Sequence, residues 1–577
     1  MKVLLLHPDD AFPLLGPKQH WDLIVDFARA PADTYKRWSK QAMCPLFSLS
    51  EFAEEVEDLG RVRQILQRGT GCMVDQQGID WWDVLSLELV PQLQQIMLVH
   101  RLSQELNANC ELYSSRRNPL ATALQKLLGA RLTILETRVQ AVIRRARDYR
   151  NVFARLENAQ LAQVVEDKFE IHRSIRSRFT RRPYSSGRPV ILLPSAYVNV
   201  SRTAASYAQL LPDHKFLLVY TRSDAKLTSL PANVRSVSLA PYFVPSDKQE
   251  TASLLDSWNS LRKQLVDSAE EFSTADTVGV LGRIPALLPW GIALRNAWSQ
   301  VFESENVTAC LSADDANPPS NIPLVMARNR GLPSIACHHG ALNYMFAIKA
   351  NHADSYLVKN EMERDYMKRI CDVAPEKMFV AALSSSKTLP TKPPAVAPWL
   401  VYFTEPYDNG GWRTDEVYRD ILPYLYSLAR SCDLKLVFKL HPFETVKGHR
   451  RMLRRLIPEY ENQIEVLAGP ASDQLWSNVQ FALTVQSSTA LECSARGIPV
   501  FLCAWLRDAF SGYVQQYARF GVGQVLESAE QIADIPRLIA GQREEPFEHR
   551  RAPPNTDSRE LGQLFSGADS LAVASNA

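Results

Sequence analysis

The chain has 577 residues, of which 46% are hydrophobic and 22% charged. This length is too great for one hydrophobic core and predicts two to four domains. The 65 lysines and arginines nearly balance the 63 acidic residues, so the net charge of +2 gives no sign of a nucleic-acid partner. Nine scattered cysteines without a C-x-x-C pair argue against a disulfide framework and predict a cytoplasmic protein with reduced thiols.

No segment of the sequence reads as a membrane span. The first apolar run, Val3–Leu6, is too short for a signal peptide, and an acidic pair follows it. The most apolar later window, residues 284–294, is short and contains two prolines. Basic residues gather between Arg144 and Arg182 and could contact anionic lipid headgroups of the inner membrane, at about 1 kcal/mol each. The alternative is a solvated helix face followed by a basic loop.

The first two thirds of the chain predict one α/β domain with a helical insertion. Short apolar runs predict strands at 3–6 and 22–27, and three- to four-residue apolar spacing predicts helices from 50 to 106. A strand at 110–114 and a helical insertion at about 119–180 follow. Strands and helices then alternate, with strands predicted at 189–194, 216–220, 237–239, 308–312, 334–338 and 354–358. Such alternation is typical of parallel strands in a doubly wound sheet. We expect residues 1–390 to form an N-terminal Rossmann-like domain that binds the acceptor.

A second α/β series follows a short linker. Residues 391–398 are rich in proline and predict a semi-rigid linker. Strands are then predicted at 399–404, 435–440, 464–467, 481–485 and 499–502, with helices between them. We expect a C-terminal Rossmann-like domain at 399–545 and a polar tail at 546–577. Ligands bind beyond the carboxyl ends of such strands, so two facing domains would enclose a cleft with a site on each wall.

The strongest candidate site lies in the second series, where the strand at 435–440 leads into His441 and Pro442. A histidine at a strand's carboxyl end can bind a phosphate oxygen as a proton donor or a cation, and Pro442 restricts the backbone that leaves the strand. Lys439 precedes this pair. The alternative is a structural histidine that caps a turn.

Three hydroxyl groups follow another strand of the same series. Ser487, Ser488 and Thr489 open a predicted helix, where backbone N–H groups favour a phosphate. The alternative is an ordinary serine cap with Glu492 as its capping-box partner. Glu492 could instead reach the ribose of a nucleotide.

These motifs resemble those of bacterial surface-polysaccharide transferases. The segment from His441-Pro442 through Ser487-Ser488-Thr489 to Gly497-Ile498-Pro499 is similar to capsule Kdo transferases and to bacterial sialyl- and polysialyltransferases. The resemblance covers about residues 395–545. It implies a two-domain GT-B fold and a CMP-linked ulosonic acid donor, such as Kdo or sialic acid, with its phosphate and ribose held by the two motifs. It also implies a metal-independent reaction without a cofactor, in which the nucleotide sugar is a co-substrate and a glycan or lipid-linked glycan is the acceptor.

The first domain offers acidic and histidine candidates at two strand ends. Asp314 and Asp315 follow the strand at 308–312 and could supply a general base for the acceptor hydroxyl, or could cap the next helix. They look loosely like the acidic motif of sialyltransferases, although Ala316 stands where a glycine is usual. His338, His339 and Gly340 end the next strand, and His339 could assist as an acid or base.

We expect Tyr197 and Asn199, after the strand at 189–194, to contact the acceptor with His338 and Gly340. No metal-ligand spacing, P-loop, G-x-G-x-x-G or G-x-S-x-G motif is evident. Three other functions stay open. They are a CDP-glycerol-type polyol-phosphate transferase, a UDP-sugar 2-epimerase-like enzyme and a non-catalytic scaffold in glycan assembly.

Overall fold

A computed structural model describes most of the chain. The described residues are 1–8, 10, 20–106, 108–136, 187–222, 225–340, 342, 352–381, 398–459, 463–507, 512–542 and 558–565. The basic region Arg144–Arg182 and all of the linker except Pro398 lie outside them.

The N-terminal residues form a five-stranded parallel sheet in the order β3-β2-β1-β4-β5. Its strands are β1 (Lys2–Leu6), β2 (Leu23–Asp26), β3 (Leu46–Ser48), β4 (Glu111–Ser114) and β5 (Arg131–Ile134). The side chains of β1 from Val3 onward are buried on both faces, as expected where helices cover a parallel sheet. Its helices include α1 (Ala32–Ala42), α2 (Glu55–Gln67), α3 (Trp81–Leu85), α4 (Val90–Glu105) and α5 (Pro119–Leu128).

A middle sheet of seven parallel strands follows, in the order β12-β11-β10-β9-β6-β7-β8. Its strands are β6 (Val190–Ser195), β7 (Phe216–Tyr220), β8 (Val234–Ser238), β9 (Val307–Ser312), β10 (Ser334–Cys337), β11 (Ser355–Val358) and β12 (Met378–Val380). The helices between them are α9 (Val198–Gln209), α10 (Lys248–Ser268), α11 (Glu270–Thr277), α12 (Arg283–Ser304), α13 (Pro318–Asn329) and α14 (Glu361–Arg369).

The C-terminal sheet has six parallel strands in the order β15-β14-β13-β16-β17-β18. They are β13 (Trp399–Phe403), β14 (Lys435–Lys439), β15 (Glu465–Leu467), β16 (Val479–Thr484), β17 (Val500–Cys503) and β18 (Gln524–Leu526). The accompanying helices are α15 (Thr414–Ser431), α16 (Val446–Leu456), α17 (Asp473–Asn478), α18 (Thr489–Ala495), the 3-10 helix η10 (Gly512–Phe520) and α19 (Ile535–Gln542).

All three sheets share one strand order. Numbered within each sheet, the strands run 3-2-1-4-5, with one or two more strands at the edge of the larger sheets, and this is the Rossmann order. The predicted α/β class with two Rossmann-like domains is confirmed in the middle and C-terminal sheets. The range 1–390, however, carries two sheets where one was expected, and no described strand belongs to both. Apolar runs reveal strands but not which strands pair, so the sequence left this division unseen.

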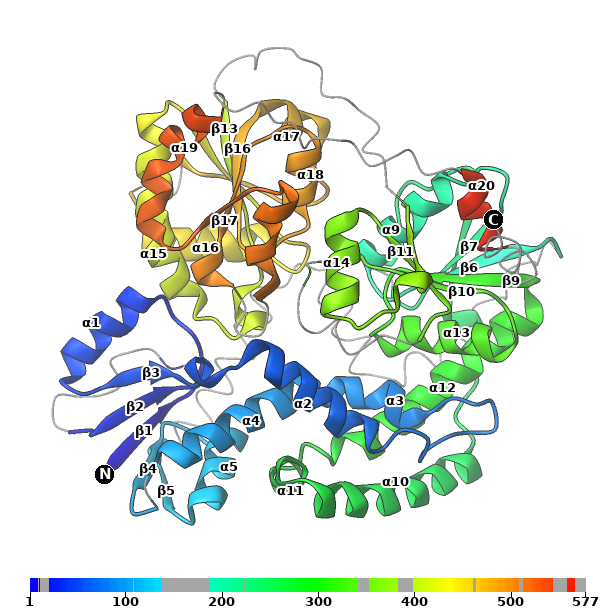
Figure 1. Cartoon of the computed structure of the whole chain (residues 1–577), viewed down its shortest axis with the longest axis horizontal. Coiled ribbons are helices and arrows are strands. Elements are labelled where there is room, and N and C mark those ends of the chain that lie inside the picture. The colour runs from blue at the N-terminus through cyan, green and yellow to red at the C-terminus, as the bar shows by residue number, and fades with distance from the viewer. Residues whose placement is uncertain are drawn as a thin grey trace.

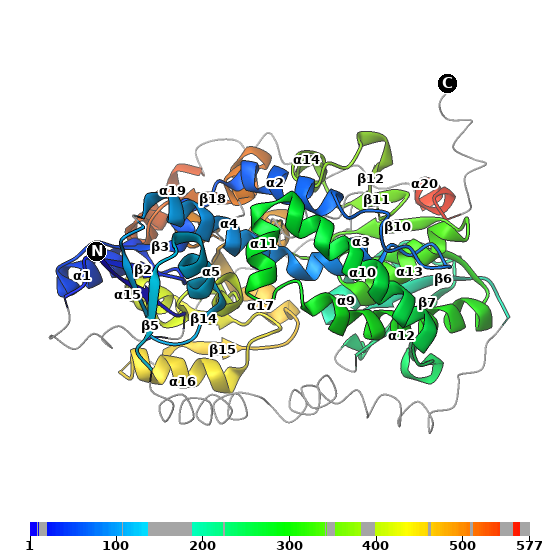
Figure 2. The same ribbon diagram turned by 90° about the horizontal axis from the view of Figure 1, so that it is seen from below.

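The N-terminal sheet is connected to the middle sheet by a layer of helices that lies along one side of the molecule (Figures 1 and 2). Four tryptophans, Trp81, Trp82, Trp258 and Trp298, are fully buried in this layer. Trp81 of α3 packs against Gly291 of α12, where an added Cβ would lie 2.5 Å from the indole. Gly291 therefore permits the close approach of these two helices.

Two predicted segments differ from the structure. Within the expected helical insertion at 119–180, the described part is helix α5 followed by β5, which is an edge strand of the N-terminal sheet. The rest, 137–180, lies outside the described residues. The expected polar tail contains helix α20 (Ser558–Gln563), and Leu561 and Phe565 are buried in the core of the middle domain. Two apolar residues in a polar, proline-containing segment were too weak a pattern to predict this return.

Candidate active site between the middle and C-terminal sheets

Side chains from the middle and C-terminal domains meet where strands of both sheets end. The ring of Phe443, after β14, lies 6.4 Å from that of Tyr197, after β6. Nearby, the Tyr513 hydroxyl of η10 donates a 2.7 Å hydrogen bond to the Met362 carbonyl of α14. We call the region around Tyr197 and Phe443 the junction. It brings together the predicted donor-side and acceptor-side motifs.

His441 begins the loop that follows β14. Its backbone N–H is 3.1 Å from both the Thr404 hydroxyl and the Glu444 carboxylate, and its ring Nδ1 accepts from the Phe443 N–H at 3.2 Å. Nδ1 is therefore an acceptor, and the ring proton lies on Nε2. Burial, and then the charge of Lys439, lower the pKa of His441 to about 4. At neutral pH His441 is therefore uncharged and can act as a hydrogen-bond donor. Of the two expected forms, a proton donor and a cation, this leaves the proton donor. Pro442, next in the loop, is exposed.

Lys439 is the last residue of β14 and is only 7% exposed. Its Nζ donates to the carbonyls of Gly469, at 2.5 Å, and Leu440, at 3.3 Å. Burial, and then the charge of Arg202, lower its pKa to about 8. Arg202 comes from α9 of the middle domain, and in the described part of the chain its guanidinium has no carboxylate partner. Two positive charges from different domains therefore lie close together, as in a site that binds an anion.

Glu492 is a carboxylate that interacts with the charge of Lys439. Its side chain is solvent-accessible at the start of α18, yet the surrounding protein raises its pKa by burial. The charges of Arg496, Lys359 and Lys439 oppose that rise. The Arg496 guanidinium lies over the Trp476 ring, 4.6 Å from its centroid. Lys359 also pairs with the Glu363 carboxylate at 3.2 Å. Arg202 and Lys439 make no ion pair among the described residues, so a bound phosphate would supply their countercharge.

The three hydroxyl groups lie between β16 and α18. The Ser487 Oγ accepts from the Thr489 N–H at 3.3 Å, while the Ser488 hydroxyl makes no capping hydrogen bond among the described residues. The Thr489 hydroxyl is buried and has no partner in this part of the structure. Ser487 therefore caps the first N–H of the helix, but no capping box with Glu492 forms among the described residues.

On the acceptor side, Tyr197, Asp314 and His339 form a hydrogen-bonded chain. The Tyr197 hydroxyl lies 2.8 Å from the Asp314 Oδ2 and 2.8 Å from the His339 Nε2. The other ring nitrogen of His339, Nδ1, lies 2.6 Å from the Ala313 carbonyl. Burial and the Asp314 carboxylate raise the pKa of Tyr197 well above its usual value, so Tyr197 stays a phenol.

Asp314 and Asp315 differ in their surroundings. Asp314 is 3% exposed, and its Oδ1 accepts from the Ala316 N–H at 2.9 Å before helix α13. Asp314 therefore holds the turn before α13, but it does not cap the helix, whose N-cap residue is Asn317. Asp315 is half-buried, and its backbone carbonyl accepts a 2.8 Å hydrogen bond from the Asn321 amide.

The remaining acceptor-side candidates are placed less uniformly. The His338 ring is 5% exposed and packs 5.9 Å from the Tyr366 ring, so it lies in the interior. Its carbonyl accepts a 2.5 Å hydrogen bond from the Lys359 Nζ. Gly340 and Asn199, the latter in the first turn of α9, are both half-buried.

Sequence reasoning missed Arg202 as a site residue and expected Tyr197 only to contact the acceptor. Both follow β6, the first strand of the middle sheet, and the crevice beside that strand is where a Rossmann sheet binds ligands. The position of β6 in the sheet would have singled them out, but that position becomes known only from the pairing of the strands.

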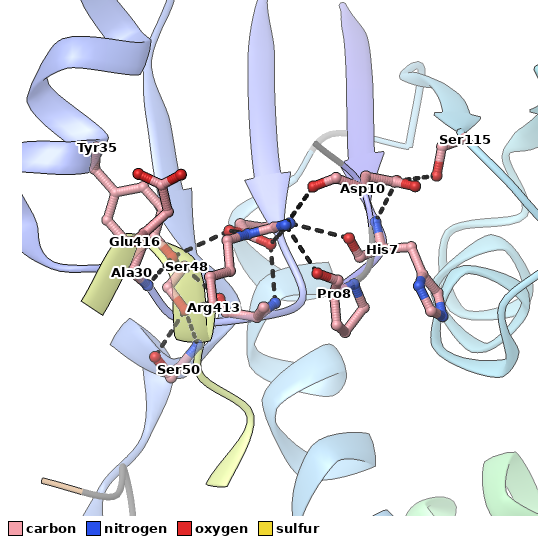
Figure 3. A network of polar contacts seen from close by, with 12 residues as sticks. His7, Pro8, Asp10, Ala30, Tyr35, Ser48, Ser50, Ser115, Arg413 and Glu416 are labelled. Atoms are coloured by element: carbon pink, nitrogen blue, oxygen red, sulfur yellow. Dashed lines mark hydrogen bonds and ion pairs between the residues drawn. The ribbon is translucent and has the colours of Figure 1, made fainter. Parts of the chain in front are cut away.

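In the N-terminal sheet, the equivalent crevice is filled by Arg413 (Figure 3). This arginine precedes α15 of the C-terminal domain and makes two 2.7 Å hydrogen bonds to the Asp26 carboxylate at the end of β2. Its guanidinium also donates to the carbonyls of His7 and Pro8 at 2.9 Å. Arg413 is 8% exposed and Asp26 is fully buried. The N-terminal crevice therefore serves contact between domains.

Two further properties concern metal ions and membranes. Within the described ranges, no three His, Cys, Asp or Glu side chains are grouped so as to hold a metal ion. None of the helices described is both long and apolar enough to span a bilayer.

No protein-family model and no curated protein sequence matches the chain. Among solved structures, a UDP-N-acetylglucosamine 2-epimerase from Listeria monocytogenes is similar with a TM-score of 0.42 and 12% identity, over 66% of this chain and 95% of that one. The wall teichoic acid polymerase TagF gives a TM-score of 0.39 and 12% identity, over 71% and 96% of the two chains. MurG from Acinetobacter baumannii gives 0.38 and 10%, over 66% and 99%. Similarity of this size transfers no activity and no residue role to this chain.

Proposed function

We propose that the chain is a glycosyltransferase of the GT-B type that transfers a sugar from a nucleotide donor to a cell-surface polysaccharide or lipid-linked glycan. The donor we favour is a CMP-linked ulosonic acid. The reaction takes place in the cytoplasm, at or near the inner membrane, and needs no metal ion. The observation that carries this proposal is the excess of positive charge at the junction, where Lys439 and Arg202 approach each other from two domains.

The donor phosphate lies at the C-terminal side of the junction. Lys439 and Arg202 offset its charge, and the His441 Nε2–H donates to a phosphate oxygen. The hydroxyls of Ser487, Ser488 and Thr489 add donors whose partners are not taken by helix capping. Preorganised donors of this kind stabilise the leaving nucleotide as the glycosidic bond to phosphate breaks. Glu492 contacts the ribose.

The acceptor hydroxyl lies at the middle-domain side, near Asn199 and Gly340. Its oxygen forms a bond to the anomeric carbon while the bond from that carbon to the phosphate oxygen breaks. Asp315 accepts the hydroxyl proton as the general base. Asp314 is less suited to this role, because its carboxylate already accepts hydrogen bonds from Tyr197 and Ala316.

A polyol-phosphate transferase with a CDP-linked donor is the second candidate. The positive charge at the junction favours it as much as it favours the first, because Arg202 and Lys439 lie close together there, and Lys439 and Arg496 act on the same carboxylate, Glu492. A diphosphate brings more negative charge than the single phosphate of a CMP-linked sugar. The two donors therefore have to be compared directly.

The experiment measures nucleotide release from CMP-, CDP- and UDP-linked donors, with and without a lipid-linked glycan fraction, in the presence of a chelator. We expect release from a CMP-linked ulosonic acid, a slow rate in water alone and a faster one with acceptor. In His441→Ala the rate should fall about 10- to 100-fold, because a hydrogen bond to a charged group contributes about 1.5–3 kcal/mol.

The matched control is His20→Ala, which removes an exposed histidine outside the junction and should leave the rate unchanged. Release from CDP-glycerol alone would select the polyol-phosphate transferase. Release of no nucleotide from any donor, or the same loss in both variants, would overturn the proposal.

A further inference from the structure

The Tyr197 hydroxyl makes two short polar contacts but has a single proton to donate. It lies 2.8 Å from both the Asp314 Oδ2 and the His339 Nε2. An ionised carboxylate only accepts, and a phenol can donate to one partner at a time. If His339 were neutral with its proton on Nδ1, Nε2 would also be only an acceptor. One of the two short contacts would then join two lone pairs.

The position of the His339 proton is set by its other ring nitrogen. Nδ1 lies 2.6 Å from the Ala313 carbonyl, and a carbonyl oxygen can only accept, so Nδ1 carries a proton. Both short contacts of Tyr197 therefore require one more proton, either on Nε2 of His339 or on Asp314. The chain of three residues holds one proton more than a neutral imidazole, a phenol and a carboxylate would carry.

The surroundings of Asp314 place that proton on the histidine. The Asp314 Oδ1 accepts the N–H groups of Ala316, at 2.9 Å, and Asn317, at 3.4 Å, where the chain enters α13. Backbone N–H groups that donate to a carboxylate favour its ionised form. Nε2–H of His339 then donates to Tyr197, and Tyr197 donates to Asp314.

We propose that His339 is an imidazolium at neutral pH and that Tyr197 is the positioning residue that links it to the Asp314 carboxylate. The part of this imidazolium in catalysis rests on the proposed function, whereas the test of its protonation does not. An imidazolium with both N–H groups engaged has no lone pair, so His339 is not the general base. Asp315, the general base in the proposed function, is the residue after Asp314.

The charged and titratable groups near these three residues include, in the described part of the chain, Arg222 after β7, Asp315 before α13, His338 after β10 and Lys359 before α14. Arg222 acts on Tyr197, lowering the pKa that burial and Asp314 raise. Because Tyr197 is hydrogen-bonded to both His339 and Asp314, it is the direct link between them.

The test is nitrogen NMR of the full chain labelled with [15N]histidine, without nucleotide and near neutral pH, with His339 assigned from a His339→Asn sample. We expect both ring nitrogens of His339 to be protonated. In Tyr197→Phe the link to Asp314 is lost, and the titration midpoint of His339 should fall by about one pH unit or more. Tyr220→Phe, which changes a half-buried tyrosine at the end of β7, is the control and should not move it.

An unprotonated Nε2 in the wild type, or the same midpoint in Tyr197→Phe, would overturn the inference. Asp314→Asn provides a second variant, and it should lower the midpoint as Tyr197→Phe does. Since no donor is present, a negative result in nucleotide release leaves this test intact, and a negative result here leaves the release assay intact. Where release is measurable, Tyr197→Phe should shift the pH profile of kcat without raising the KM for the donor.

Discussion

Burial at the junction shifts three ionisable side chains of one loop and its strand toward their neutral forms. It lowers the pKa of Lys439 to about 8 and of His441 to about 4, and it raises the pKa of Glu444 to about 7. Such shifts gather at binding and catalytic sites, where a ligand supplies the missing countercharge. Glu444 also accepts the His441 N–H and the Thr404 hydroxyl, so it holds the His441 loop in place.

The raised pKa of Glu444 predicts a pH dependence of stability. In the unfolded chain this carboxyl ionises near 4.5, whereas in the folded protein it keeps its proton to about 7. Between these values the native state binds the extra proton, so the free energy of unfolding falls as pH rises, by up to about 3 kcal/mol. Urea unfolding at several pH values should show this decline, and Glu444→Gln should remove that part of it.

The control for this experiment is Glu527→Gln, which changes an exposed carboxyl and should leave the decline intact. A wild-type stability that rises with pH between about 4.5 and 7 in proportion to Glu444 ionisation would contradict the assignment.

At the scale of elements, apolar periodicity predicted most strands and helices but not how they assemble. The strands after β6 appeared in the sequence as alternating apolar runs. His441 and Ser487 were found because each follows such a run, and Lys439 because it lies at the end of one. Between the predicted strands at 237–239 and 308–312 the chain forms three helices, α10, α11 and α12. Arg202 was not predicted and Tyr197 was expected only to contact the acceptor, because their partners lie more than a hundred residues away. Contacts over such separations leave no periodic signal.

Alanine at two helix glycines should have opposite effects on the free energy of unfolding, because only Gly291 lies in the contact between α3 and α12. Alanine at Gly291 would place Cβ 2.5 Å from the fully buried Trp81 ring, which cannot move aside. We expect a loss of about 1–3 kcal/mol in the free energy of unfolding. Gly60 in α2 has no atom within 4 Å of an added Cβ, and Gly60→Ala should gain up to about 1 kcal/mol from helix propensity. Thermal unfolding that ranks the two variants the other way would contradict this packing.

At the scale of the molecule, the N-terminal domain is attached to both other domains. It packs on the middle domain through the tryptophan-rich helices and receives Arg413 of the C-terminal domain in its crevice. A backbone bridge adds to this contact, in which the Arg413 N–H donates to the Arg29 carbonyl at 2.7 Å. The sequence could not indicate this arrangement, because Asp26 and Arg413 are far apart in the chain and neither stands in a recognisable motif.

Arg413→Met should destabilise the protein strongly, because it leaves the Asp26 carboxylate buried without its partner. The expected loss is about 3–5 kcal/mol, and the double variant with Asp26→Asn should lose less than the two single effects together. Lys36→Met, which breaks an exposed pair with Asp33, is the control and should leave the free energy of unfolding almost unchanged. Equal effects of Arg413→Met and Lys36→Met in urea unfolding would show that the inter-domain pair contributes little.

The central claim is that the junction binds the phosphate of a nucleotide, and calorimetric titration with CMP, CDP and UDP tests it most directly. We expect the wild type to bind at about pH 7 and to bind more weakly at about pH 9, because Lys439, with a pKa of about 8, loses its charge. Lys439→Met should bind at least about tenfold more weakly and lose this pH dependence. Binding of none of the three nucleotides, or unchanged binding by Lys439→Met, would contradict the account.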